Sequence, residues 1–467
     1  MIGRLHWFCL ALFILTGCTV GPNYVRPPVP GSGAAWIRPA SPGSVDPAWW
    51  RPLGDPVLED LINTAVARNL DLREAEALLR EARANRGAAV GRSLPALSAT
   101  GSAAETQISR NGALPIASLP GFDRRFSLFD GGFDASWELD LWGGTRRSIE
   151  GATGREAAAE ARRVDVGLQV IAEVGRTYAA LRASQAQLTS IRSDAQARNT
   201  LARLVRQRLE AGEASRYDVA QADAQAGSAR ARVADADADV TDAAYRLALL
   251  VGRPPEALLR PLLIAKRIPE PPAIVAAGIR SELLRRRPDV RAAEADLAAA
   301  TADIGVETAN LFPRFSLVGG LAQQARRAGD LSSSGSTRFS IGPSFSWPIF
   351  SGGRIRAQIR AADARADAAR TRYEKAVLSA LSDSETAINR YAAAQETRQD
   401  LAAALTEHAL GLALARQRFR AGEDDLLTIL AVQSLYNAAE QQAIAARKDE
   451  LSAYIALSKA LGGGWKE

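Results

Sequence analysis

The chain has 467 residues, of which 47% are hydrophobic and 24% are charged, so it has the composition of a folded protein with room for two or three domains. Its formal net charge is +6, but acidic and basic residues are interspersed and no run of Lys/Arg alternates with aromatics, which argues against a nucleic-acid groove. The histidines, His6 and His408, have no cysteine or acidic cluster at metal-ligand spacing. Since the sequence also has no Ser/His/Asp set or phosphate-binding loop, an enzyme is the least favoured class.

The chain begins with the pattern of a lipoprotein signal peptide. Arg4 supplies a positive charge, and residues 5–15 form an apolar run that is too short to span a bilayer. The run ends in Leu15-Thr16-Gly17-Cys18, which resembles the bacterial lipobox, where a peptidase cuts before a lipid-modified cysteine. We therefore predict that residues 1–17 are removed and that Cys18 is the lipid anchor, with a covalent diacylglycerol and an N-acyl chain. No other cofactor and no metal site is predicted.

The residue after this cysteine indicates the destination of the mature chain. It is Thr19, not the aspartate that commonly retains lipoproteins at the inner membrane. The outer membrane is therefore favoured. An ordinary secretory signal or a short buried segment is the alternative interpretation of the same N-terminal residues.

The mature chain contains an internal repeat at an offset of about 210 residues. Three motifs recur in the same order in both halves: Arg206–Glu213 with Arg416–Glu423, Ser93–Leu97 with Leu311–Phe315, and Asp140–Arg146 with Pro348–Arg354. Chance rarely produces three such matches in register. We therefore predict an extended N-terminal segment at 18–54, a first repeat at 55–250, a Pro-rich linker at 251–279 and a second repeat at 280–467.

Each repeat is expected to start with a helix and to continue with a pair of strands, at about 95–140 and about 314–350. Around Trp137 and Phe339 apolar residues alternate with serine or acidic residues, which predicts one apolar and one polar face. Segments of roughly 10 residues with aromatics near their ends suit tilted transmembrane strands. The strand pattern alone fits a half-buried sheet in a soluble domain equally well. The polar segments between the strands resemble long extracellular loops.

Two long helices follow the strands in each repeat, at about 146–210 and 214–250 and then at about 352–420 and 425–461. The first has no proline and would be roughly 95 Å long at about 1.5 Å per residue. In the returning helices apolar residues recur every seventh position, with alanine at most positions of the complementary seam, which predicts coiled-coil packing with closely spaced backbones. Asp235, Asp237 and Asp239 avoid the seam and are predicted to form a solvated face.

Each pair of long helices turns within a few residues, at Ala211–Glu213 and Ala421–Glu423. Gly212 and Gly422 suit the left-handed conformation at a helix C-terminus, and the arginines before them suit the helix dipole. Helix capping alone is sufficient to explain the two glycines.

The strand number constrains the assembly. Single-chain bacterial barrels start at about eight strands, so four strands from one chain cannot close a barrel, and an open sheet edge in lipid would leave backbone groups unsatisfied. If the strands enter a membrane, two or three chains must share one barrel of about eight or twelve strands, of which the larger has room for a channel. The residue patterns leave the number of chains open.

Further motifs are spread over the mature chain: Cys18–Pro27, Trp49-Trp50 with Asp55–Ile62, Leu283–Glu294 with Ile304-Gly305 and Leu311–Pro313, and Leu457–Trp465. Together they resemble the outer-membrane factor family of TolC-like channels, specifically its lipoprotein branch that works with resistance-nodulation-division (RND) pumps. The resemblance covers essentially all of the mature chain.

This resemblance implies an α+β membrane protein: a homotrimer with a twelve-stranded β-barrel, four strands per chain, continued by a long α-helical coiled-coil barrel that projects into the periplasm. It implies a passive outer-membrane exit duct for small molecules, with a periplasmic adaptor and an inner-membrane RND pump as partners. Adaptor contacts are expected at the helix tips, around Arg208, Gly212, Arg418 and Gly422, where solvation and dipole compensation explain the arginines equally well.

One departure from the family pattern concerns the gate. Relatives often carry an aspartate and an arginine on the last inner helix, whereas Ala431 and Ser434 occupy the matching positions here. We hypothesise that acidic residues near the turns constrict the tip instead: Asp218, Asp223, Asp424 and Asp425.

Two other functions remain open at this point. One is the outer-membrane duct of an ABC-type (type I) secretion system, which nothing in the chain excludes. The other is a structural or adhesive coiled-coil lipoprotein without a pore, which the two pairs of alternating strands disfavour.

Overall fold

The computed structural model describes residues 19–28, 34–38, 43, 46–109 and 123–464. The predicted signal peptide, Cys18 and the final Trp465 lie outside the described residues. The chain forms two compact units: a sheet unit (1–27, 79–158 and 293–373) and a hairpin unit (28–78, 159–292 and 374–467). Each unit contains parts of both halves of the sequence, so these units cut across the division at 55–250 and 280–467.

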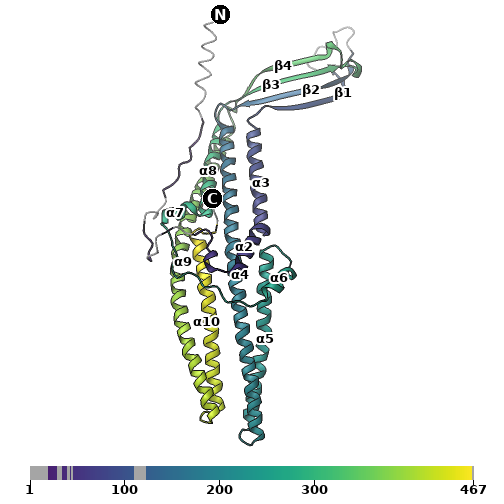
Figure 1. Ribbon diagram of the computed structural model, residues 1–467. Helices are drawn as coiled ribbons and strands as arrows, with labels where there is room; N and C mark the ends of the chain where they lie inside the picture. The colour runs from purple at the N-terminus through teal and green to yellow at the C-terminus, as the bar shows by residue number, and fades with distance from the viewer. Residues whose placement is uncertain (1–18, 29–33, 39–42, 44–45, 110–122, 465–467) are drawn as a thin grey trace. The chain divides into compact units, whose positions relative to one another are not determined.

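The sheet unit contains one antiparallel sheet in the order β1-β2-β3-β4 (Figure 1). Its strands are β1 (Ala96–Gln107), β2 (Arg125–Leu139), β3 (Arg314–Ala325) and β4 (Thr337–Ser346). β4 ends before Trp347 and Ile349, which were expected on the strand, because Pro348 has no N–H to donate to a ladder. Pro343 is tolerated within β4, which is an edge strand.

The strand register gives the sheet two different faces. One row across the four strands is apolar: Ala99, Phe133, Leu321 and Phe339. The adjacent row is small or polar: Ser98, Asp134, Gly320 and Ser340. On the apolar face Phe339 is 79% exposed and Ile341 75%, so a single chain leaves this face uncovered.

The sheet unit also contains the later parts of α3 (Leu70–Gly91) and α8 (Pro288–Ala309) and the first parts of α4 (Gly144–Glu210) and α9 (Arg354–Ala421). The N-terminal segment is fixed to it by the buried Arg147. The Arg147 guanidinium donates to the carbonyl of Val20 at 3.2 Å and to Asn23 Oδ1 at 2.6 Å, and the Val20 N–H donates to the carbonyl of Trp142 at 3.0 Å. Farther along, Arg26 forms an ion pair with Glu294 at 2.6 Å.

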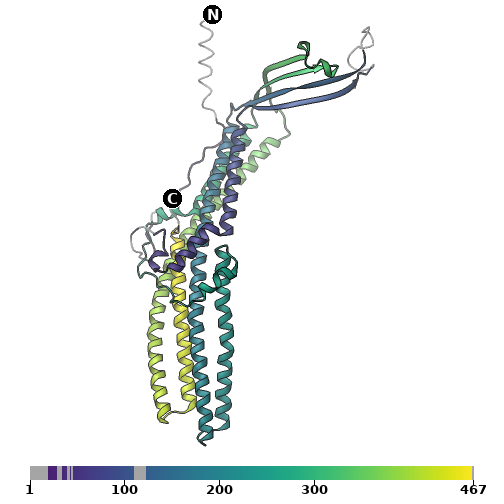
Figure 2. The same ribbon diagram turned by 45° about the vertical axis from the view of Figure 1, so that its right-hand side comes forward.

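The hairpin unit contains two helical hairpins (Figures 1 and 2). The first joins α4 to α5 (Arg216–Leu250), and the second joins α9 to α10 (Leu426–Ala460). These bounds lie within about two residues of the expected ones. The buried residues of α5 include the seam alanines Ala222, Ala229 and Ala236, and small side chains allow the two backbones to approach closely. Asp235, Asp237 and Asp239 are exposed, as the pattern predicted.

Short helices pack beside the hairpins: α2 (Pro56–Arg68), α6 (Pro255–Leu262) and α7 (Arg280–Arg286). The expected Pro-rich linker therefore contains one short helix. The fully buried Arg182 of α4 fixes it by donating to the carbonyl of Ile264 at 2.9 Å. The core of this unit includes Trp49, Tyr178 and Ile455. Within the described part of the chain, none of the helices is long and apolar enough to cross a membrane.

Gly21 leaves no room for a side chain, because it has a φ of +88° and an added Cβ would lie 2.5 Å from the Cα of Gly305. Gly21→Ala should release the N-terminal segment, seen as faster amide exchange of residues 19–26 by mass spectrometry. Gly87→Ala is the matched control, since a Cβ at this helical position meets nothing within 4 Å and alanine favours a helix by roughly 0.5–1 kcal/mol. Unchanged exchange in Gly21→Ala would contradict this account of the segment.

Candidate functional site

The two hairpin turns share one backbone geometry. Gly212 has a φ of +78° and Gly422 a φ of +79°. The N–H of Glu213 donates to the carbonyl of Arg208 at 2.7 Å, and the N–H of Glu423 donates to the carbonyl of Arg418 at 3.0 Å. Both helices thus end in a left-handed glycine that satisfies their last carbonyls. The need for a positive φ accounts for glycine at both positions.

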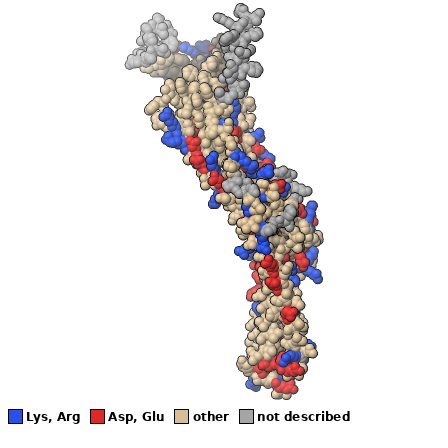
Figure 3. Space-filling view, turned by 90° about the vertical axis from the view of Figure 1, so that its left-hand side faces the viewer, with Lys and Arg blue, Asp and Glu red and all other residues tan. Residues whose placement is uncertain are grey.

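The tip arginines have partners within the tips. Arg418 pairs with Asp424 at 3.0 Å and more loosely with Glu423 at 3.8 Å. Arg208 pairs with Glu213 at 3.6 Å, and its Cζ also lies 5.4 Å from the ring centre of Phe419 on the other hairpin. Figure 3 shows acidic and basic residues gathered at the hairpin end. The side chains of Arg208 and Arg418 are 37% and 59% exposed, and ion pairs of such exposed groups contribute little to stability.

The four candidate gate aspartates lie on both hairpins, and each has a local partner. Asp223 forms an ion pair with Arg206 at 2.6 Å, and Asp424 forms one with Arg418 at 3.0 Å. Asp218 accepts from the backbone N–H of Ser215 at 2.8 Å in a capping box, and Asp425 caps α10 by accepting from the N–H of Thr428 at 2.7 Å.

The two capping aspartates stay ionised at neutral pH. Hydrogen bonding to Ser215 lowers the pKa of Asp218, and hydrogen bonding to Thr428 lowers the pKa of Asp425. The positions of the missing family pair, Ala431 and Ser434, are exposed on α10 and carry no charge.

A buried polar network that no sequence pattern predicted joins the two hairpins and is centred on Asp194 of α4. Asp194 accepts from Arg198 at 2.9 Å, from Arg232 of α5 at 3.0 Å and from Asn437 of α10 at 2.6 Å. The side chains of Asp194 and Arg198 are only 5% and 8% exposed. A buried carboxylate with three donors holds α4, α5 and α10 in one arrangement, because breaking any contact leaves a buried polar group unpaired.

The network continues on the second hairpin. Gln433 donates to Asn437 at 3.0 Å and accepts from Arg416 of α9 at 2.7 Å. A second link between hairpins runs from Ser190 of α4 to Glu440 of α10. Apolar residues of α4 recur at three-, four- or seven-residue spacing from Ile171 to Ile191, and Asp194 and Arg198 extend this series. That spacing was the available signal for their burial. No spacing identifies Asn437 as a partner.

Among the residues that the structure describes, no three or more His, Cys, Asp or Glu side chains are placed to hold a metal ion.

Comparison with known proteins identifies the family. The family model described as outer membrane efflux protein matches residues 61–253 and 279–463. The chain is 33% identical to the pyoverdine export outer membrane protein OpmQ of Pseudomonas aeruginosa, over 90% of this chain and 87% of that protein. It is 31% identical to the toluene efflux pump outer membrane protein TtgF of Pseudomonas putida, over 99% and 97%. Its fold matches the solved structure of the outer-membrane channel OprN with a TM-score of 0.86 and 35% identity, over 96% of this chain and 100% of that chain.

An amphipathic antiparallel sheet and paired long helical hairpins define the class of outer-membrane channels with helical and β domains. The chain belongs to the outer membrane efflux protein family. It is the outer-membrane exit duct of a tripartite efflux system, and its family consists of channels rather than enzymes. The resemblance seen in the sequence is thereby confirmed.

Asp194→Ala tests the link between the hairpins. It leaves Arg198 buried without its carboxylate, which should destabilise the contact by about 3–5 kcal/mol. The change should appear as at least roughly hundredfold faster amide exchange of residues 190–200. Asp237→Ala is the matched control, because the Asp237 ion pair with Arg192 is exposed and should contribute less than about 1 kcal/mol. Equal effects of the two substitutions would contradict the assignment.

The helix caps predict how the tips respond to acid. An aspartate with a lowered folded-state pKa contributes stability that is complete above its ordinary value of 3.8 and is lost as the pH falls through the lowered value. Pepsin should therefore cut both turns faster below about pH 3.8 than its intrinsic pH profile explains. In Asp425→Ala the turn before α10 should lose this pH dependence while the turn before α5 keeps it. The same dependence at both turns of the variant would contradict the capping role.

Proposed function

We propose that three copies of this chain share one barrel of about twelve strands and form a passive, water-filled exit duct through the outer membrane. The observation that carries this proposal is the sheet. Within the described residues β1 pairs only with β2 and β4 only with β3, so each copy offers two open edges. Neighbouring copies satisfy these edges by pairing β4 with β1, which lipid alone cannot do.

The two faces of the sheet support the same arrangement. The uncovered apolar face, with Phe339 and Ile341, suits contact with lipid, and the opposite face suits a water-filled interior. On that polar face Arg338 of β4 pairs with Asp130 of β2 at 2.8 Å.

The clamped N-terminal segment supports the lipid anchor at Cys18. Val20, two residues later, is bonded to Trp142, and Trp142 lies between the end of β2 and the start of α4. A lipid on Cys18 is thus attached close to one end of the strands, where a membrane boundary is expected. Two or three acyl chains anchor a protein firmly, at about 0.8 kcal/mol per buried CH₂. The duct is therefore anchored in the outer membrane with its helical barrel in the periplasm.

The partners are a periplasmic adaptor and an inner-membrane RND pump. The adaptor docks at the hairpin tips around Arg208, Gly212, Arg418 and Gly422, where the tip charges remain accessible. The export of small molecules is supported by the relatives, one named for pyoverdine export and one for toluene efflux. Substrate choice and energy use belong to the pump, because the duct supplies only a path.

Single-channel recording in planar bilayers tests this function together with the gate. The double substitution Asp223→Asn and Asp424→Asn removes the carboxylates that pair with Arg206 and Arg418, and should raise the conductance above that of the unsubstituted protein. Asp235→Asn, an exposed aspartate on the same helix as Asp223, is the control and should leave conductance unchanged.

The outcomes of this experiment separate the two claims. If the double variant conducts like the unsubstituted protein, these aspartates are not part of the gate but the duct stands. If neither protein conducts ions, the duct itself is contradicted and a structural lipoprotein becomes the better account.

A further inference from the structure

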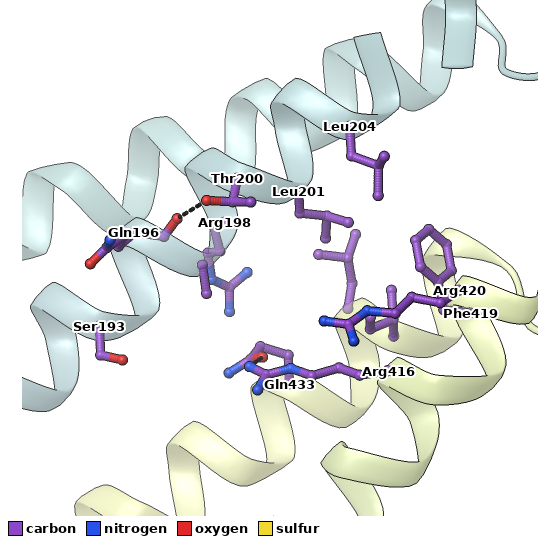
Figure 4. Close-up of a pocket in the computed structure, with 13 residues that line it drawn as sticks. Ser193, Gln196, Arg198, Thr200, Leu201, Leu204, Arg416, Phe419, Arg420 and Gln433 are labelled. Carbon is purple, nitrogen blue, oxygen red and sulfur yellow. Dashed lines mark hydrogen bonds between the residues drawn. The ribbon is translucent and has the colours of Figure 1, made fainter. Parts of the chain in front are cut away.

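A cavity of about 440 Å³ lies between α4 and the α9–α10 hairpin, near the end of α9 (Figure 4). Its volume falls within the range of small-molecule sites, about 300–1,000 Å³. All of its lining residues belong to the hairpin unit. The helix caps at the tips and the polar network around Asp194 do not account for a cavity of this size.

Three guanidinium groups converge on this cavity. Figure 4 shows Arg198 of α4 and Arg416 and Arg420 of α9 pointing toward one another, and none of the lining residues is acidic. Asp194 neutralises Arg198, and Arg416 donates to the neutral amide oxygen of Gln433. Arg420 has no hydrogen bond or ion pair with any residue that the structure describes. About two positive charges on the wall therefore lack an anionic partner.

Ser193, Gln196, Thr200 and Gln433 add neutral polar groups to the lining, and the remaining wall is apolar. Leu201 and Leu204 contribute from α4, Phe419 from α9, and Ile429 and Leu430 from α10. Leu204 is 40% exposed, whereas Phe419 and Ile429 are buried. The cavity thus combines an apolar side with two guanidinium groups, those of Arg416 and Arg420, that have no anionic partner among the described residues, so its chemistry is amphipathic.

We propose that this cavity binds a small amphiphilic organic anion. Its carboxylate, sulfonate or phosphate group lies between Arg416 and Arg420, because guanidinium groups bind oxyanions through paired hydrogen bonds. Its apolar body lies against Leu201, Leu204 and Phe419. An inorganic anion would leave the apolar wall of the cavity exposed to water. A neutral apolar molecule would leave the guanidinium groups of Arg416 and Arg420 without a counter-ion.

Such a ligand touches both hairpins, since α4 belongs to one and α9 and α10 to the other. It therefore adds a contact between them near their tips and stabilises the arrangement in which the cavity exists. This binding site does not depend on the proposed duct, because binding is measured without any transport.

The test is titration calorimetry on the full protein in nanodiscs of neutral phosphatidylcholine, with empty nanodiscs as the blank. The probe is 2-naphthalenesulfonate, which combines an anionic group with a body small enough for the cavity. We expect saturable binding of one molecule per chain. Neutral 2-naphthol and inorganic sulfate should each bind at least about tenfold more weakly, because each lacks one half of the recognition.

Variants locate the site. Arg416→Gln and Arg420→Gln should each weaken binding of the sulfonate at least about tenfold, and Arg420→Lys should have a smaller effect because it keeps the charge. Arg203→Gln is the matched control, since Arg203 lies on α4 but lines a different cavity toward α5. Because Arg416 and Arg420 are exposed, all variants should keep the circular dichroism of the unsubstituted protein.

Three results would overturn the proposal. Equal affinity for the sulfonate and for 2-naphthol would remove the role of the charge. Unchanged binding by the Arg416→Gln/Arg420→Gln double variant would place the site elsewhere. Absence of saturable binding at millimolar concentrations would exclude the site altogether.

Discussion

The two open edges of a four-stranded antiparallel sheet are the constraint on which the rest of this structure depends. Backbone N–H and C=O groups at an edge need partners, and in a bilayer neither water nor lipid supplies them. The exposed apolar face of the same sheet disfavours an aqueous location, since large uncovered apolar patches mark contact surfaces. In the proposed assembly, copies of the chain that share their edges satisfy both requirements, and the barrel and its central water path depend on that pairing.

The hairpin unit meets a different requirement, which is to hold two pairs of long helices together. Seam alanines such as Ala229 bring α4 and α5 close within one hairpin. Between the hairpins the contact depends partly on buried polar groups around Asp194. Polar contacts depend more strongly on geometry than apolar ones, so a small displacement breaks several at once. Such an interface favours one defined arrangement of the two hairpins.

The sequence predicted the periodic parts of the fold well, because periodicity is local. The heptads and the absence of proline located the helices, and Gly212 and Gly422 located the turns. Contacts between distant segments left no such signal: Arg147 binds Val20 across 127 residues, and Asp194 meets Asn437 across 243. The sequence repeat also gave no indication that the compact units would mix segments of both halves. At the tips the sequence located the two turn glycines, whereas the buried network and the cavity beside Arg420 depend on side chains that only the folded chain brings together.

Native mass spectrometry of the full protein, expressed with its own signal peptide and extracted in mild detergent, tests the shared barrel and its anchor most directly. The account predicts a trimer in which every chain lacks residues 1–17 and carries the mass of acyl chains on Cys18. A monomer or dimer that persists as the main species in gentle detergents would contradict the shared barrel of about twelve strands.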